Sequence, residues 1–315
     1  MARRIDVVPD EVAAPGADHA VLVHQRGAVP TAQGAPRHDR AVLYLHGRND
    51  YFFQTHLADA FLSAGYEFYA LDLRTCGRAG VGYPSPHDVR DLRVHDEEIS
   101  EALRIIRSEH GHDVVVLNGH STGGLQAVIW AADHPGTVDA VVLNSPWLDL
   151  RGSALVRSYG SALVDLLSRR DPERVIGEPG SGEEDNYVAA LHRRWRGEWD
   201  WDLALKPAPS FPVRAGFLAG IRRLQREVHH GLGIRVPILV CCSTVSGGAK
   251  ASLEEAQRSD VVLDVEQIID RSQYLGDDVT VRQIPDGVHD LALSGPLARA
   301  EYLQAVMHWL DNRLH

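Results

Sequence analysis

Short apolar runs alternate with longer amphipathic segments through the first half of the chain. The runs have the length of strands and occupy residues 41–45, 67–71, 114–117 and 140–143. Segments of helical length lie between them, at 54–64, 92–108 and 122–133. Near-continuous apolar strands need cover on both faces, and strands that alternate with helices form parallel sheets. The pattern therefore predicts an α/β fold with a mostly parallel central sheet flanked by helices.

The alternation is interrupted between residues 150 and 236, where the chain is rich in arginine, proline and tryptophan and has no regular strand pattern. Outside that segment, other patterns predict an edge strand at 20–23, strands at 237–241 and 279–284, a loop at 29–38 and a closing helix at 298–310. Residues 150–236 are therefore predicted to be an insertion within one sheet-based domain. Residues 1–149 and 237–315 would form that domain.

Charge and composition narrow the class of protein. Lys and Arg number 32 and Asp and Glu number 43, so the formal net charge is −11 at pH 7. Nucleic-acid binders normally carry a basic domain or stripe, so no nucleic-acid partner is expected. No apolar run approaches the ~20 residues that a membrane span requires, and the N-terminus lacks the apolar stretch of a secretory signal. Because Cys76, Cys241 and Cys242 cannot form a disulfide framework, we predict a cytoplasmic protein without stable membrane insertion.

The strongest local motif is Gly119-His120-Ser121-Thr122-Gly123, a G-x-S-x-G sequence between a strand pattern and a helical pattern. A sharp strand-to-helix turn is the setting of a nucleophile elbow. The two outer glycines permit the tight turn, which lifts the Ser121 hydroxyl out at the carboxyl end of the strand. The helix N-terminus supplies unpaired N–H groups and a dipole that favours developing negative charge. Ser121 is therefore predicted to be a nucleophile.

The elbow is one of four motifs that share a pattern with a known family. The others are Leu45-His46-Gly47, Leu71-Asp72-Leu73-Arg74-Thr75-Cys76-Gly77 and Gly287-Val288-His289-Asp290. From about residue 41 to residue 310, the chain resembles the α/β-hydrolase family, within it the monoacylglycerol-lipase-like or serine aminopeptidase (S33-type) group of esterases and lipases. Thr75 stands where glycine is usual. The resemblance implies that the insertion at 150–236 is a helical cap over the serine.

A serine hydroxyl needs a base to take its proton, and the chain has 17 histidines. His289 is favoured because it follows the 279–284 strand pattern through a turn and comes after the serine, in the Ser–acid–His order of this fold. In similar esterases the acid precedes a short apolar pair and a helix, which favours Asp260. Asp264, expected near the start of that helix, and Asp149, after the preceding strand, stay open as alternatives.

The backbone N–H groups of Arg48 and Thr122 are the expected donors of an oxyanion hole. Arg48 follows the His-Gly pair after the first strand of the motif series, and Thr122 follows the nucleophile. Six residues near these motifs or in the insertion are candidates for substrate binding: His46, Tyr51, Phe52, His120, Trp147 and Trp199. Packing beneath the cap is the competing interpretation of the aromatic ones.

No metal or cofactor is expected. The histidine pairs at 110/112 and 229/230 have no carboxylate or cysteine partner in their motifs, so solvated loops are expected there, and no phosphate-binding glycine loop is present. The chain is therefore predicted to be a serine hydrolase that cleaves a carboxylic ester of an apolar-acyl or monoacylglycerol-like small molecule through an acyl-enzyme on Ser121. A biosynthetic acyl transferase, cyclase or thioesterase, or a non-catalytic ligand-binding protein, could use the same scaffold. The oligomeric state stays open.

Overall fold

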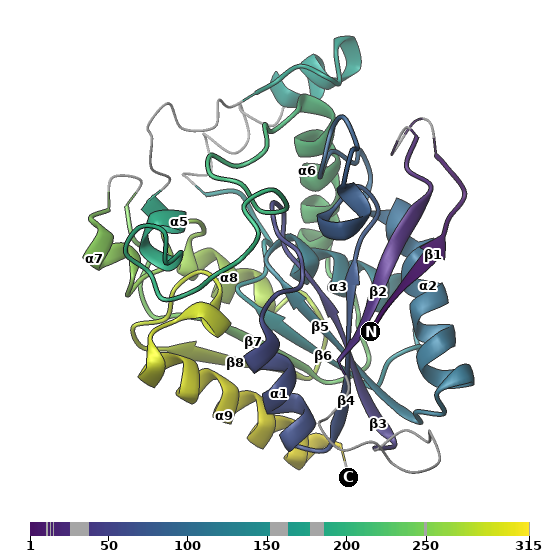
Figure 1. Ribbon diagram of the computed structural model, residues 1–315, viewed down its shortest axis with the longest axis vertical. Helices are drawn as coiled ribbons and strands as arrows, with labels where there is room; N and C mark the ends of the chain where they lie inside the picture. Colours follow the sequence, from purple (N-terminus) through teal and green to yellow (C-terminus); the bar gives the residue numbers. More distant parts are fainter. Residues whose placement is uncertain are drawn as a thin grey trace.

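The structure, a computed structural model, describes all residues except 11, 13, 15, 26–37, 152–162, 177–185, 249–250 and 315. The chain forms an eight-stranded sheet in the order β1-β2-β4-β3-β5-β6-β7-β8 (Figure 1). The strands are β1 (Ala2–Asp6), β2 (His19–Gln25), β3 (Arg40–Leu45), β4 (Tyr66–Asp72), β5 (Val114–His120), β6 (Ala140–Asn144), β7 (Ile238–Ser243) and β8 (Val279–Ile284). From β4 to β8 all neighbours are parallel, whereas β1 and β2 run antiparallel to their neighbours.

Every predicted strand is present, but one was given the wrong place in the sheet. The run at 20–23 lies in β2, which is not an edge strand because β1 pairs with its outer side. Only Ile5 of β1 is buried, so this strand has no apolar run that the sequence pattern could reveal. The loop predicted at 29–38 falls outside the described residues except for His38.

Helices cover both faces of the sheet, which confirms the predicted fold class (Figure 1). α1 (Thr55–Ser63) and α9 (Pro296–Arg313) lie side by side on one face. The other face carries α2 (Asp96–Arg104), α3 (Thr122–Asp133), α6 (Ala215–His230) and α8 (Val265–Ser272). Shorter elements are η1 (Gly77–Gly80), η2 (Leu92–His95), the π-helical η3 (Ile105–Glu109), α5 (Asn186–Leu191), α7 (Leu253–Ala256) and η4 (Leu291–Leu293). The helix predicted at 92–108 is thus η2, α2 and η3 in succession.

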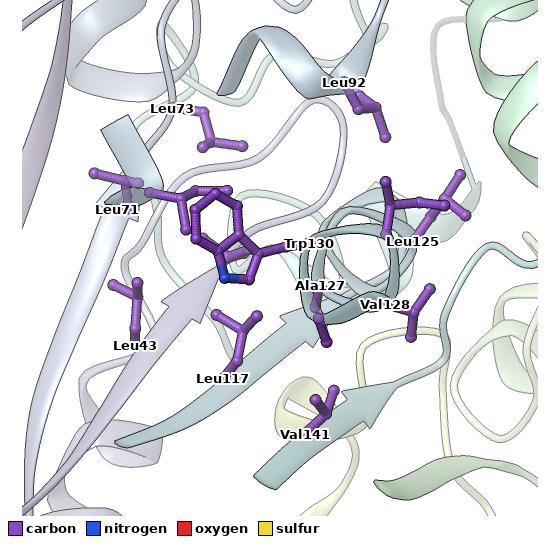
Figure 2. Packing of buried hydrophobic residues seen from close by; sticks show 14 of the residues in the cluster. Leu43, Leu71, Leu73, Leu92, Leu117, Leu125, Ala127, Val128, Trp130 and Val141 are labelled. Carbon is purple, nitrogen blue, oxygen red and sulfur yellow. The ribbon is translucent and has the colours of Figure 1, made fainter. Parts of the chain in front are cut away.

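The two faces of the sheet follow from the alternation of side chains along each strand. In β3, Leu43 belongs to the hydrophobic cluster under α3, whereas Tyr44 belongs to the cluster under α1 and α9. Figure 2 shows Trp130 of α3 packed among leucines from neighbouring strands, including Leu71 and Leu117. Burial of apolar side chains on both faces explains why these strands are near-continuous apolar runs. Among the described residues, no helix combines the length and apolarity needed to cross a bilayer.

The segment between β6 and β7 divides its contacts between two hydrophobic clusters. Apolar side chains of α6, including Phe217 and Leu224, lie in the same core cluster as α3 and the sheet. Val188 and Leu191 of α5 and Trp201 form a separate cluster with residues of the β3 and β8 loops. We therefore propose that α6 is a core helix, and that only the part of 150–236 before α6 acts as a cap.

A buried ion pair joins the end of β4 to α2. The guanidinium of Arg74 lies 2.6 Å from the Glu98 carboxylate, and both side chains are almost fully buried. His95 Nδ1 contacts the same carboxylate at 2.8 Å. Burial raises the pKa of Glu98, but His95 and Arg74 outweigh burial and lower it to about 2. The carboxylate is therefore ionised in the folded protein and fixes α2 against the sheet.

Replacing Glu98 by glutamine is expected to lower the free energy of unfolding at pH 7 by about 2 kcal/mol, because the buried guanidinium of Arg74 loses its buried carboxylate and keeps only the exposed one of Glu97, at 3.0 Å. The folded pKa of Glu98 lies below its ordinary value of 4.5, so its contribution is present above pH 4.5 and is lost as the pH falls toward 2. Urea unfolding at a series of pH values measures this. A difference between Glu98→Gln and the parent that stays constant from pH 7 to pH 2.5 would contradict the assignment.

Candidate active site

Ser121 lies in a sharp turn between β5 and α3. Its backbone has φ 53° and ψ −114°, a conformation that side-chain-bearing residues seldom adopt. A Cβ on Gly119 would lie 2.4 Å from the carbonyl oxygen of Gly123, and a Cβ on Gly123 would lie 2.3 Å from that of Leu45. Only glycine fits at both positions. The G-x-S-x-G spacing therefore follows from two close backbone approaches, and it leaves Ser121 at the carboxyl end of the sheet.

Three predicted residues form one line of hydrogen bonds. Ser121 Oγ lies 3.0 Å from His289 Nε2, and His289 Nδ1 lies 2.9 Å from Asp260 Oδ2. Because the carboxylate can only accept, Nδ1 carries the proton and Nε2 is left to accept the serine proton. His289 and Asp260 are buried. This is the arrangement that a serine nucleophile needs for activation by a base that is itself oriented by an acid.

Asp260 is held in place by the backbone of its own loop. Its Oδ1 accepts hydrogen bonds from the N–H groups of Val262 at 2.9 Å and Leu263 at 2.7 Å. Burial raises the pKa of Asp260, but the charge and hydrogen bond of His289 and these two N–H groups outweigh burial, so the pKa lies below its ordinary value. Asp260 is therefore a carboxylate with one oxygen anchored and the other directed at His289.

The two alternative acids have different partners. Asp264 is the N-cap of α8, where its side chain accepts from the N–H of Glu266 at 3.1 Å. Asp149 is buried against the guanidinium groups of Arg222, at 2.9 Å, and Arg271, at 3.1 Å. Asp264 thus lies at the start of a helix, as expected from the sequence. Of the three candidate acids, the structure brings Asp260 against His289.

The loop after β3, residues 46–50, lies against Ser121 and is called the oxyanion loop below, after the donor predicted at Arg48. A Cβ on Gly47 would lie 3.1 Å from the Cβ of Ser121, so a side chain there would crowd the serine. The guanidinium of Arg48 donates to the carbonyl oxygens of Phe211, at 2.8 Å, and Pro212, at 2.6 Å. Burial lowers the pKa of Arg48 to about 10. These bonds tie the loop to the segment between β6 and β7.

A cavity of about 440 Å³ opens over Ser121. Its apolar lining consists of Trp147, Leu150, Val188, Val213, Val262 and Leu263. Its polar lining consists of Arg48, Asn49, Asp50, His120, Ser121, Thr122, Arg151, Tyr187, Lys206, Ser210 and His289. Both predicted oxyanion donors, Arg48 and Thr122, therefore line the same cavity as the nucleophile. The volume is within the range of small-molecule sites.

Two of the six predicted substrate-binding residues, His120 and Trp147, line this cavity, and the other four have other surroundings. His46 accepts from the N–H of Leu73 at 3.2 Å, and Phe52 is buried in the cluster under α1. The hydroxyl of Tyr51 accepts from the N–H of Asp202 at 2.8 Å. Trp199 stacks on His56 and donates to the carbonyl oxygen of Leu293 at 2.7 Å. Packing beneath the inserted segment is therefore the interpretation that matches the contacts of Tyr51, whereas Phe52 packs under α1 and Trp199 packs from the inserted segment onto α1.

Lining residues from the insertion, such as Tyr187, Lys206 and Val213, were missed by the sequence analysis. They belong to no motif. Whether they line the same cavity as Ser121 depends on how the insertion folds back over the sheet. Lys206 and Lys250 are the two lysines in the sequence. The rarity of lysine in a chain that uses arginine almost everywhere else is the one sequence signal that could have drawn attention to Lys206.

Of the histidines that were expected in solvated loops, His230 is exposed, but His110, His112 and His229 are partly or fully buried. His112 is buried, and the hydroxyl of Tyr69 bridges it to His110 at 2.9 and 2.7 Å. His229 Nε2 lies 3.2 Å from Asp149, so this pair does have a carboxylate partner. Sequence spacing could not show either contact, because both partners are remote in the chain. Among the described residues, one group has the geometry to hold a metal ion, formed by Asp50, His120 and Asp290.

Comparison with known proteins gives a family match over most of the chain. The model of the serine aminopeptidase S33 family matches residues 36–293. A monoacylglycerol lipase of Mycolicibacterium smegmatis is 34% identical over 91 residues, which are 29% of this chain and 31% of that lipase. The matched region thus spans about a third of the lipase's length.

Two solved structures extend the likeness over the whole chain. A soluble variant of monoglyceride lipase from Saccharomyces cerevisiae, in complex with a substrate analog, has a TM-score of 0.65 at 16% identity and covers 98% of this chain and 96% of its own. A thermostable carboxyl esterase from Bacillus coagulans, in complex with glycerol, has a TM-score of 0.68 at 14% identity and covers 100% and 99%. At such low identity these two structures show a common α/β-hydrolase fold.

Gly123→Ala is expected to disrupt the turn at Ser121, because the new methyl group would meet two backbone carbonyl groups, of Leu45 and His46, that cannot move aside. We expect unfolding free energy to fall by about 1–3 kcal/mol and modification of Ser121 by a fluorophosphonate to slow on the order of 10²-fold. Gly295→Ala is the matched control, since a Cβ there meets nothing within 4 Å. An equal labelling rate in both variants would refute the tight approach.

Proposed function

This chain belongs to the serine aminopeptidase S33 family, and on that premise we propose that it hydrolyses carboxylic esters of small molecules through an acyl-enzyme on Ser121. The observation that carries the proposal is the line of hydrogen bonds from Ser121 through His289 to Asp260. Ser121, at one end of this line, lies in a cavity of about 440 Å³. The partial likeness to a monoacylglycerol lipase supports an ester as the substrate class.

The reaction begins at the serine hydroxyl. His289 Nε2 takes the proton of Ser121 as Oγ attacks the ester carbonyl carbon, and the carbonyl oxygen becomes an oxyanion. The N–H groups of Arg48 and Thr122 hold that oxyanion, while Asp260 stabilises the imidazolium. His289 then returns the proton to the departing alcohol oxygen, which leaves an acyl-enzyme. A water molecule, deprotonated by His289, attacks the acyl carbon and releases the acid and the free serine.

The lining of the cavity supports an ester with an apolar acyl chain. Trp147, Leu150 and Val213 offer an apolar wall within the same cavity as Ser121. An apolar wall favours the burial of a hydrocarbon chain, at about 0.8 kcal/mol for each buried methylene, and the polar lining residues leave room for the ester and alcohol oxygens beside it. An apolar acyl ester of the monoacylglycerol type therefore fits the lining better than a charged peptide does.

The part of the insertion before α6 would act as a cap over the nucleophile. Asn49 of the oxyanion loop donates to the carbonyl oxygen of Pro207 at 3.1 Å and accepts from the N–H of Phe211 at 3.2 Å. Together with the bonds of Arg48 to the same stretch, these contacts fix the cap segment to the loop that supplies an oxyanion donor. Cap and oxyanion hole would therefore be assembled as one unit.

Incubation with a fluorophosphonate probe is expected to place an adduct on Ser121, and Ser121→Ala should abolish it. A panel of p-nitrophenyl esters of graded chain length then reports acyl preference, with kcat/KM expected to rise over the first added methylenes by up to about 4-fold each, as about 0.8 kcal/mol of burial allows. Peptide mapping by mass spectrometry identifies the labelled residue. Labelling at Ser121 without release of p-nitrophenol would favour an acyl transferase that needs another acceptor.

Asp260→Asn is expected to lower kcat by on the order of 10⁴-fold, because the amide would no longer hold the correct tautomer of His289. Asp264→Asn is the matched control: an asparagine can still cap α8, so kcat should not change and unfolding free energy should change by less than about 0.5 kcal/mol. Steady-state ester hydrolysis and thermal unfolding measure both variants. Near-normal activity of Asp260→Asn would move the acid role to another residue.

A further inference from the structure

Four ionisable side chains are buried together beside the proposed active site, and they are called the charge cluster below. Potential ligand atoms of Asp50, His120 and Asp290 all lie within 4.8 Å of one another, and all three residues are buried. His120 Nδ1 lies 3.6 Å from Oδ2 of Asp50. Lys206 completes the charge cluster, since its Nζ lies 2.9 Å from Oδ1 of Asp50 and its side chain is 5% exposed.

Each member of the charge cluster comes from a different part of the site. Asp50 is the last residue of the oxyanion loop, and His120 directly precedes the nucleophile. Asp290 directly follows the proposed catalytic histidine, and Lys206 comes from the cap segment. The cluster therefore joins the four chain segments whose relative positions decide whether the reacting groups meet.

Two members of the charge cluster are also fixed from outside. Asp290 accepts from the side-chain amide of Asn144 on β6, at 2.7 Å, and from that of Gln54 at the start of α1, at 3.1 Å. The ammonium group of Lys206 lies 5.0 Å from the ring centroids of Phe53 and Trp201. Contacts of an ammonium with two aromatic faces hold it in a defined place.

The formal charges of the cluster balance when His120 is protonated. Two carboxylates and one ammonium leave a net charge of −1 in a buried volume, and an imidazolium brings the sum to zero. Burial lowers the pKa of His120, but Asp290 and Asp50 outweigh burial, so the pKa lies above its ordinary value. A divalent cation beside a neutral His120 would instead leave a net positive charge next to the ammonium of Lys206. The charge balance therefore favours a proton over a metal ion.

We propose that the charge cluster holds the oxyanion loop, the nucleophile turn and the His289 loop in their relative positions, and that Lys206 is the positioning residue that the cap contributes. The rings of His120 and His289 lie 5.0 Å apart, so a shift in the cluster is transmitted directly to the base. Without Lys206, the cluster carries an uncompensated buried charge, which the surrounding segments can relieve only by moving apart or by admitting water. The kinetic test of this role rests on the proposed esterase function.

Lys206→Met removes the charge and keeps an unbranched apolar side chain. We expect kcat to fall on the order of 10²-fold, as for a small misplacement of reacting groups, while KM changes by less than about threefold. The double variant Asp50→Asn/Lys206→Met removes one charge of each sign and leaves the Asp290 carboxylate within 4.8 Å of His120. It is expected to recover most of the lost kcat.

Arg222→Met is the matched control, because Arg222 is a buried cation that also lies 2.9 Å from a buried carboxylate, Asp149, outside the charge cluster. It is expected to lower the thermal unfolding temperature and to leave kcat unchanged. A double variant no more active than Lys206→Met, or a rise in KM alone, would overturn the positioning role. If Lys206→Met cannot be purified, the charge-balanced double variant decides, since it is expected to fold and to be active.

A readout without catalysis separates failure of this inference from failure of the proposed function. In ¹⁵N-histidine NMR spectra of the parent recorded over a pH titration, the pKa of His120 is expected above its ordinary value, because the carboxylates of Asp290 and Asp50 lie beside the ring. A pKa of His120 at or below its ordinary value would refute the charge cluster even if the protein cleaves esters. A raised pKa in a protein that shows no adduct at Ser121 would refute the esterase and leave the charge cluster intact.

Discussion

The close approach of two chain segments, the turn at Ser121 and residues 45–47, is the constraint on which the rest of the site depends. Gly123 lies against the carbonyl oxygens of Leu45 and His46, and Gly47 lies against the side chains of His120 and Ser121. These contacts set the distance between the serine and the oxyanion loop. Because backbone atoms in a packed sheet have little freedom, the hydroxyl and the expected N–H donors are positioned before a substrate arrives, as electrostatic stabilisation of a transition state requires.

The parallel sheet then explains how residues far apart in the sequence meet at this turn. β3, β5, β7 and β8 run in the same direction, so their carboxyl ends share one edge. The oxyanion loop follows β3, Ser121 follows β5, Asp260 lies after β7 and His289 after β8. Each residue occupies a separate loop, and loops at this edge are where open α/β sheets bind ligands. The strands supply the frame, and a few loop residues supply the chemistry.

This division explains how much the sequence alone could predict. Strands such as β5 are buried on both faces and are therefore visible as apolar runs, and the glycines around Ser121 form a motif because the turn permits nothing larger. β1 escaped notice because burial of Ile5 alone leaves no periodic signal. Tyr51 packs beneath the insertion instead of lining the cavity, a choice made by tertiary contacts with Trp201 and Asp202 that no local pattern encodes. Local geometry leaves a motif, whereas long-range packing does not.

Long-range charge pairing, like long-range packing, leaves no motif in the sequence. The charge cluster raises the question of why a hydrolase would bury ionised groups beside its proposed base. Apolar side chains of similar volume would pack as well and often with greater stability, since burying ions carries a large desolvation cost. An apolar contact, however, tolerates sliding, whereas the 2.9 Å contact between Lys206 and Asp50 is lost when the two groups move apart. The ionised cluster thus trades stability for a defined alignment of the cap with the oxyanion loop.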